Sequence, residues 1–133
     1  MKKLFLLLVL ILLFFSACSC SFFNPQISEI TTASRINSKT LEPAEKATTF
    51  TESDEVIYCV VYIKNVLNKQ TTIKADWIFL KDNSQISSET QKIRGTGYVA
   101  FQKKRPEEGW PKGKYRVEVF LGETKSTTEF EIK

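Results

Sequence analysis

Cysteines at positions 18, 20 and 59 carry the most reactive side chains of this sequence. A thiolate acts as a nucleophile or metal ligand when a base or a second ligand stands beside it. The chain contains no histidine and no Cys-x-x-Cys pair, which excludes a Cys-His nucleophile, a zinc site and a thioredoxin-like redox pair. Two fates remain for these thiols: covalent modification, or a disulfide between Cys20 and Cys59. Cys59 lies in an apolar run, which favours a small buried core residue instead.

The first seventeen residues have the layout of a secretory signal peptide. Lys2 and Lys3 form a basic head, residues 4–15 are unbroken apolar sequence, and Ser16 and Ala17 are small. The apolar stretch is too short to cross a bilayer as a helix. We therefore expect it to direct export and then to be cleaved.

The cysteine directly after Ala17 resembles the lipobox of bacterial lipoproteins, in which that cysteine is acylated and becomes the mature first residue. The resemblance implies a leader over 1–17, lipid on Cys18, a tether over 18–26 and one domain over 27–133. The protein would then sit in the cell envelope, on the outer side of the cytoplasmic membrane or in an outer membrane. Phe15 stands where leucine is usual, and Cys20 offers a second processing point.

Charge and residue types argue against several functions. Without the leader, 17 basic and 15 acidic residues remain, so the formal charge falls from +4 to +2. Such a balanced surface gives no reason to expect nucleic acid as a partner. Carboxylates that could pair for glycosidase chemistry are Asp76, Glu107 and Glu108. Asp76 is expected to point outward from its strand beside Lys74, and the adjacent glutamates in a loop lack the burial that would raise a pKa. We expect no enzyme, no cofactor and no metal.

The elements that position these residues are predicted to be β-strands throughout. Strand-like runs cover 27–36, 55–64, 71–81, 85–93, 98–102, 114–121 and the stretch around 128–132, with a loop or irregular edge at 37–49 and a loop at 103–113. Alternating apolar residues and closely spaced turns predict about seven strands. This pattern predicts an all-β fold, an immunoglobulin-like antiparallel β-sandwich. Trp77 on the third strand and Tyr115 at the start of the penultimate strand fit that plan.

The segment Gly109-Trp-Pro-Lys-Gly-Lys-Tyr-Arg-Val-Glu-Val-Phe-Leu121, followed by Phe130-Glu-Ile-Lys133, resembles a C-terminal domain of many small bacterial lipoproteins and secreted proteins. The resemblance is close over the last third of the chain and looser before it. It implies an immunoglobulin-like module outside the cytoplasm and brings no catalytic residues. Trp110 is expected to cap the open end of the sandwich.

Two surfaces are candidates for contact with a partner. The first is an aromatic face with Tyr58, Tyr62 and Phe120, beside Ile78 and Leu80. Exposed faces of this kind mark a protein partner or a homodimer. The alternative is that the N-terminal segment, Phe50 included, folds over this face.

The second candidate surface is a basic loop with Lys103, Lys104, Arg105 and Lys112. It could face anionic lipid headgroups, envelope phosphates or an acidic partner, or it could simply be a solvated loop. The sequence thus predicts a lipid-anchored, non-enzymatic binding or scaffold module for a protein or an envelope polymer. The alternative is a secreted inhibitor or small-ligand carrier acting through residues 103–112.

Overall fold

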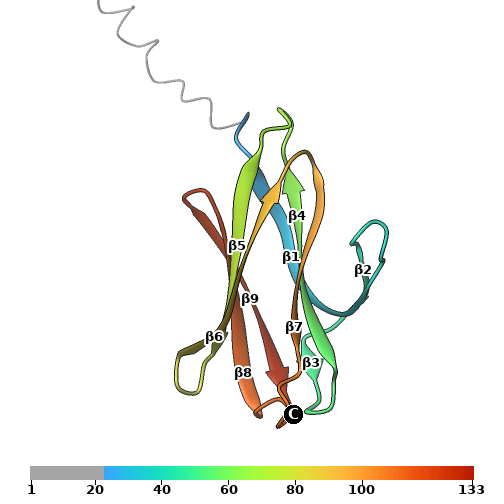
Figure 1. The fold of residues 1–133 in the computed structure, drawn as a ribbon, viewed down its shortest axis with the longest axis vertical. Coiled ribbons are helices and arrows are strands. Elements are labelled where there is room, and N and C mark those ends of the chain that lie inside the picture. The colour runs from blue at the N-terminus through green and yellow to red at the C-terminus, as the bar shows by residue number, and fades with distance from the viewer. Residues whose placement is uncertain (1–22) are drawn as a thin grey trace, which may run out of the picture.

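The computed structural model describes residues 23–133, whose regular structure is built from β-strands (Figure 1). The strands of this part are β1 (Gln26–Ile36), β2 (Pro43–Lys46), β3 (Thr49–Phe50), β4 (Val56–Lys64), β5 (Thr71–Phe79), β6 (Ser84–Ile93), β7 (Gly97–Lys104), β8 (Gly113–Leu121) and β9 (Thr124–Ile132). Seven of them are long, as predicted, and β2 and β3 are short. The expected all-β sandwich is confirmed.

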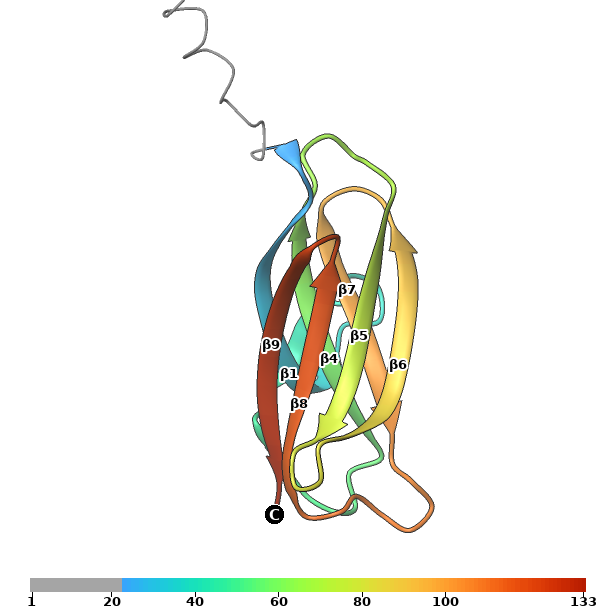
Figure 2. The same ribbon diagram turned by 90° about the vertical axis from the view of Figure 1, so that its left-hand side faces the viewer.

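The strands form two sheets packed face to face. One sheet has the order β2-β1-β4-β7 and the other β3-β9-β8-β5-β6. Figure 2 shows β9, β8, β5 and β6 side by side, with β1, β4 and β7 behind them. Neighbouring strands pair antiparallel except β3 and β9, which run parallel. The polar strand β6 lies at an edge, as predicted, where polar side chains discourage pairing with other molecules.

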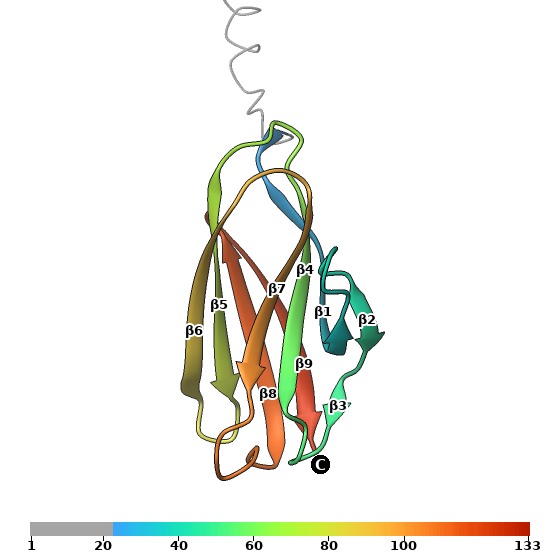
Figure 3. The same cartoon turned by 45° about the vertical axis from the view of Figure 1, so that its right-hand side comes forward.

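The stretch 37–49, predicted as a loop or irregular edge, contains β2 and the start of β3 (Figure 3). β2 begins at Pro43 and occupies an edge of its sheet, where a residue without an N–H group is tolerated. β3 adds Phe50 beside Ile132 of β9, and the Lys133 N–H donates to the Phe50 carbonyl at 3.0 Å. The N-terminal segment is thereby fastened to both sheets.

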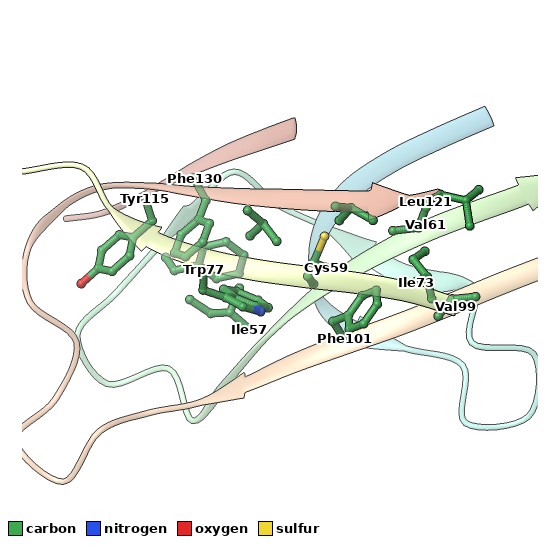
Figure 4. Packing of buried hydrophobic residues seen from close by; sticks show 14 of the residues in the cluster. Ile57, Cys59, Val61, Ile73, Trp77, Val99, Phe101, Tyr115, Leu121 and Phe130 are labelled. Atoms are coloured by element: carbon green, nitrogen blue, oxygen red, sulfur yellow. The ribbon is translucent and has the colours of Figure 1, made fainter. Parts of the chain in front are cut away.

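The core lies between the sheets and follows the predicted alternation (Figure 4). On β4 the inward residues are fully buried, and so are those of β5 up to Trp77; together they are Ile57, Cys59, Val61, Ile63, Ile73, Ala75 and Trp77. Cys59 is a free thiol, and burial raises its pKa to about 12. Cys59 is thus the buried core residue that was expected. Cys20, the partner in the disulfide alternative, lies outside the described residues.

Phe130 stands at the centre of an aromatic cluster near one end of the core. Its ring stacks on Tyr115 with centroids 4.9 Å apart and planes 5° from parallel. The edges of Phe50, Trp77 and Trp110 meet the same ring at 5.6, 6.0 and 6.4 Å. Edge-to-face and offset contacts of this kind each add about 0.5–1.5 kcal/mol beyond the burial of area. One side chain therefore joins β3, β5, β8, β9 and the β7–β8 loop.

The entry into β8 forms a tyrosine corner. The Tyr115 hydroxyl donates to the Pro111 carbonyl at 2.6 Å, and burial raises the pKa of Tyr115 to about 12. Gly113 has φ +137°, and a Cβ there would lie 3.1 Å from the Phe79 ring. Glycine is therefore required both by its backbone conformation and by the ring against it.

We predict that Tyr115→Phe lowers the free energy of unfolding by about 0.5–1.5 kcal/mol, because the hydrogen bond to the Pro111 carbonyl is lost while the ring stays in place. Urea unfolding followed by tryptophan fluorescence measures this. Tyr62→Phe is the control, since the ring contact of Tyr62 survives the change. Equal stability of Tyr115→Phe and the parent would contradict a stabilising role for the hydrogen bond.

Candidate functional site

The chain enters and leaves the sandwich at opposite ends (Figure 1). We call the end where β1 begins the entry end; it also carries the turns at 65–70, 94–96 and 122–123. The far end carries the loops at 51–55, 80–83 and 105–112 and the last residue, Lys133. Strands of nine residues separate the two ends by about 30 Å.

The predicted lipid site falls outside the part of the chain that the structure describes. This holds for the leader 1–17, for Cys18 and Cys20, and for most of the tether. Within residues 23–133, no helix has the length and apolarity needed to cross a membrane. The same residues contain no group of three or more metal-ligating side chains placed to hold an ion.

The predicted aromatic face is not one surface. Tyr58 and Tyr62 lie on the outer side of the four-stranded sheet, whereas Phe120 lies on the outer side of the five-stranded sheet. Alternation along a strand shows which residues share its face, but not which sheet the strand joins. Ile78 belongs to β5 and pairs with Arg116 of β8, so it too lies away from the two tyrosines.

Tyr98, which the sequence reasoning passed over, completes the surface around Tyr62. The two residues are paired across β4 and β7, and their rings meet edge to face at 4.9 Å. Alternation with the inward Val99 and Phe101 would have pointed Tyr98 outward. We call Tyr58, Tyr62 and Tyr98 the tyrosine face.

The residues between the tyrosines are buried. Val60 points to this side yet is 1% exposed, and Ala33, opposite Tyr58 on β1, is fully buried. Phe50 does not cover the face as the alternative had it, because its ring lies in the core against Phe130. An ion pair between the Lys46 ammonium and a Glu29 carboxylate oxygen, 2.8 Å apart, stands at the rim. The face is thus a half-buried aromatic strip with a charged border.

Phe120 lies in a charged setting instead. The Lys74 ammonium sits 4.8 Å from the centre of its ring and 3.3 Å from an Asp76 carboxylate oxygen. Asp76 points outward as predicted, is 8% exposed and accepts a hydrogen bond of 2.6 Å from the Ser88 hydroxyl. These contacts hold the side chains in place. Glu118 of β8 lies opposite Asp76, and its carboxylate is 3.4 Å from the Lys125 ammonium.

The four residues of the predicted basic loop do not form a single flexible loop. Two of them belong to a strand, and the other two make fixed contacts. Lys103 and Lys104 belong to β7, which continues its ladder with β4 up to the pair Val56–Lys104. Neighbouring residues of a strand point to opposite sides, so these two charges diverge. Arg105 donates from its guanidinium to the Ser53 carbonyl at 2.7 Å.

Lys112 and Trp110 tie the remainder of this loop to residues 51–55. The Lys112 ammonium lies 3.7 Å from a Glu52 carboxylate oxygen. The Trp110 indole donates to the Asp54 carbonyl at 2.8 Å, and the side chain is 2% exposed. Trp110 caps the end of the sandwich, as expected, and the β3–β4 and β7–β8 loops form one bonded unit.

The most exposed apolar side chains lie at the entry end. Val66 and Leu67 in the β4–β5 turn are 67% and 51% exposed, and Phe23 is 49% exposed. The sequence signal for this tip is an apolar pair, Val66-Leu67, between the predicted strands 55–64 and 71–81.

Comparison with known proteins supports the fold. No family model matches the sequence, and no curated protein matches it. Among solved structures, the chain is similar to an immunoglobulin-like protein from Pseudomonas aeruginosa, with 12% sequence identity and a TM-score of 0.53. The match covers 83% of this chain and 97% of that one. The domain is therefore an immunoglobulin-like β-sandwich, a fold that is usually non-catalytic.

We predict that Trp110→Ala lowers the free energy of unfolding by about 3–5 kcal/mol, because it removes a buried ring from the core. Lys112→Ala is the control from the same loop and should cost under about 1 kcal/mol, since its ion pair is exposed. Urea unfolding followed by circular dichroism compares them. A stable Trp110→Ala domain would contradict the capping role and favour a binding role for this ring.

Proposed function

We propose that this chain is a lipid-anchored, extracytoplasmic, non-enzymatic module that presents an immunoglobulin-like sandwich to a protein or envelope-polymer partner. Lipid on Cys18 would hold it on the outer side of the cytoplasmic membrane, or on an outer membrane where the cell has one. The leader pattern of residues 1–17 and the cysteine after Ala17 support the anchor.

The observation that carries the proposal is the separation of the chain's point of entry from the far end. An anchor upstream of β1 attaches the sandwich by one end, and the other end stands about 30 Å away. A tether of residues 18–26 reaches at most about 30 Å when fully extended. The basic side chains near the far end are thus badly placed for the membrane that holds the anchor, which favours a partner out in the envelope.

The tyrosine face is the surface that best suits a protein partner. Tyrosine is enriched at interfaces because it combines a large apolar ring with a polar tip and loses little conformational entropy. The rings of Tyr62 and Tyr98 already hold each other in place. A second copy of the chain is one such partner, which keeps the homodimer among the outcomes of the test below.

The geometry gives less support to an inhibitor or carrier that works through residues 103–112. A gating segment must move away from its neighbours. Here Arg105, Gly109 and Trp110 are all hydrogen-bonded through their backbone N–H groups, and two of these bonds run to residues 52 and 55. Opening the loop would also withdraw Trp110 from the core.

We predict that Cys18→Ala moves the protein from the membrane fraction to the soluble fraction, whereas Cys20→Ala leaves it in the membrane. The mass of the mature N-terminus measures the lipid directly. Loss of lipid in Cys20→Ala alone would move the processing site to residue 20. An unacylated N-terminus in the unchanged protein would overturn the anchor.

We predict that Tyr58→Ser with Tyr62→Ser abolishes chemical crosslinking of the anchored protein to its partner or to a second copy in intact membranes. The changed residues lie at the surface, and circular dichroism checks that the fold persists. Phe120→Ser is the control on the other sheet and should keep the crosslinked product. A product that survives the tyrosine changes would place the partner elsewhere on the sandwich.

A further inference from the structure

Of the four large hydrophobic side chains that are exposed in residues 23–133, three lie at the entry end. Val66 and Leu67 form the tip of the β4–β5 turn, and Phe23 lies where the chain approaches β1. Gln26 of β1 pairs with Lys64 of β4, so the residues before β1 run beside this turn (Figures 1 and 3). The fourth, Ile86, lies near the start of β6, toward the far end of the sandwich. The exposed large apolar side chains of the described residues are therefore concentrated at the entry end.

The β4–β5 turn is built to keep its apolar tip outside. Asn65, at its base, is 2% exposed and closes the turn with both side-chain groups: the amide donates to the Lys69 carbonyl at 2.6 Å, and the side-chain oxygen accepts from the Lys69 N–H at 3.0 Å. Its own N–H donates to the Thr96 hydroxyl at 2.8 Å. The hydrogen bonds of Asn65 thus brace the 65–70 turn against the 94–96 turn.

A second set of contacts joins the same two turns. The Arg94 guanidinium donates to the Gln70 side chain at 3.4 Å. Asn68, at φ +52°, places its side-chain oxygen 3.0 Å from where a Cβ on Gly95 would stand. The apolar tip is a preformed protrusion, because folding Val66 and Leu67 back would break the contacts at its base.

Positive charge surrounds this protrusion. Lys64, Lys69 and Arg94 are exposed at its base, and none of them belongs to an ion pair of the described chain. The acidic residue in the turns of this end is Glu123. Apolar side chains at a tip with lysine and arginine behind them match a bilayer surface, where rings and aliphatic groups enter the interface and cations meet phosphate groups.

We propose that the β4–β5 tip, with Val66, Leu67 and Phe23, contacts the outer surface of the bilayer that holds the lipid anchor, with Lys64, Lys69 and Arg94 facing anionic headgroups. This inference rests on the proposed function, because it takes the membrane from the anchor. It adds a second point of attachment. The apolar leader and Cys18 precede Phe23 by only a few residues, so this end is the one brought to the bilayer. The sandwich then stands upright, with its strands along the membrane normal.

The test uses the full chain, processed in cells and reconstituted into vesicles of phosphatidylcholine with or without phosphatidylglycerol. Leu67→Trp puts a fluorophore at the tip, and Ile86→Trp is the matched control at an exposed apolar position of β6. Brominated phosphatidylcholine quenches tryptophan that enters the bilayer. We expect at least a twofold loss of the added fluorescence in Leu67→Trp and none in Ile86→Trp, relative to the parent with its buried Trp77 and Trp110.

The outcomes distinguish failure of the membrane contact from failure of the anchor. Protein that carries lipid and floats with vesicles but shows equal quenching at both positions overturns the membrane contact and leaves the anchor standing. Protein without lipid that fails to float overturns both. Quenching of Leu67→Trp that increases with phosphatidylglycerol supports contact of the basic residues with anionic headgroups. This increase should disappear when Lys64→Gln and Lys69→Gln are added. A tip that crosslinks to a protein and is not quenched assigns the surface to that protein and overturns the membrane contact.

Discussion

The packing of aromatic rings around Phe130 is the interaction on which the rest of the sandwich depends. Its ring joins β3, β5, β8 and β9, and through Trp110 it also fixes the β7–β8 loop. The Trp110 indole in turn holds the Asp54 carbonyl, so the shape of the far end follows from the core behind it. The loops of this end are therefore part of the packed structure rather than attachments to it.

The core is stabilised by packing without a covalent link between the sheets. In antibody domains a disulfide joins the two sheets next to the buried tryptophan, with its second cysteine two residues after the tyrosine of the corner. Here Cys59 is a free thiol, and Val117 stands two residues after Tyr115. The Trp77 indole N–H has no hydrogen-bond partner among the described residues, which costs about 1–3 kcal/mol. The apolar contacts around Trp77 must offset that cost.

Sequence patterns predicted this fold well where a strand has one buried face. The alternation in 114–121 gave the inward set from Tyr115 to Leu121 correctly, because burial imposes a period of two along any such strand. The pattern carries no information on which sheet a strand enters. That is why Phe120 was grouped with Tyr58 and Tyr62, although the two sets lie on opposite sides.

Features that depend on contacts between distant segments were also beyond local patterns. β3 is only two residues long and is defined by its parallel pairing with β9. Lys103 and Lys104 look like loop residues by composition. They nevertheless continue an edge strand, because they pair with Ile57 and Val56 of β4. The exposure of Val66 and Leu67 follows from the hydrogen bonds of Asn65, one of which runs to Thr96, in a turn some thirty residues further on.

The contact between Phe50 and Phe130 has a consequence for the order in which the molecule folds. The two rings lie eighty residues apart in the chain, and β9 brings the central ring of the cluster last. Native pairing across such distances is slow, because a long loop must close before its contacts form. While a ribosome is still making β9, the earlier strands lack the ring around which they pack. The aromatic cluster, and with it the core, can therefore be completed only after the last strand has been made.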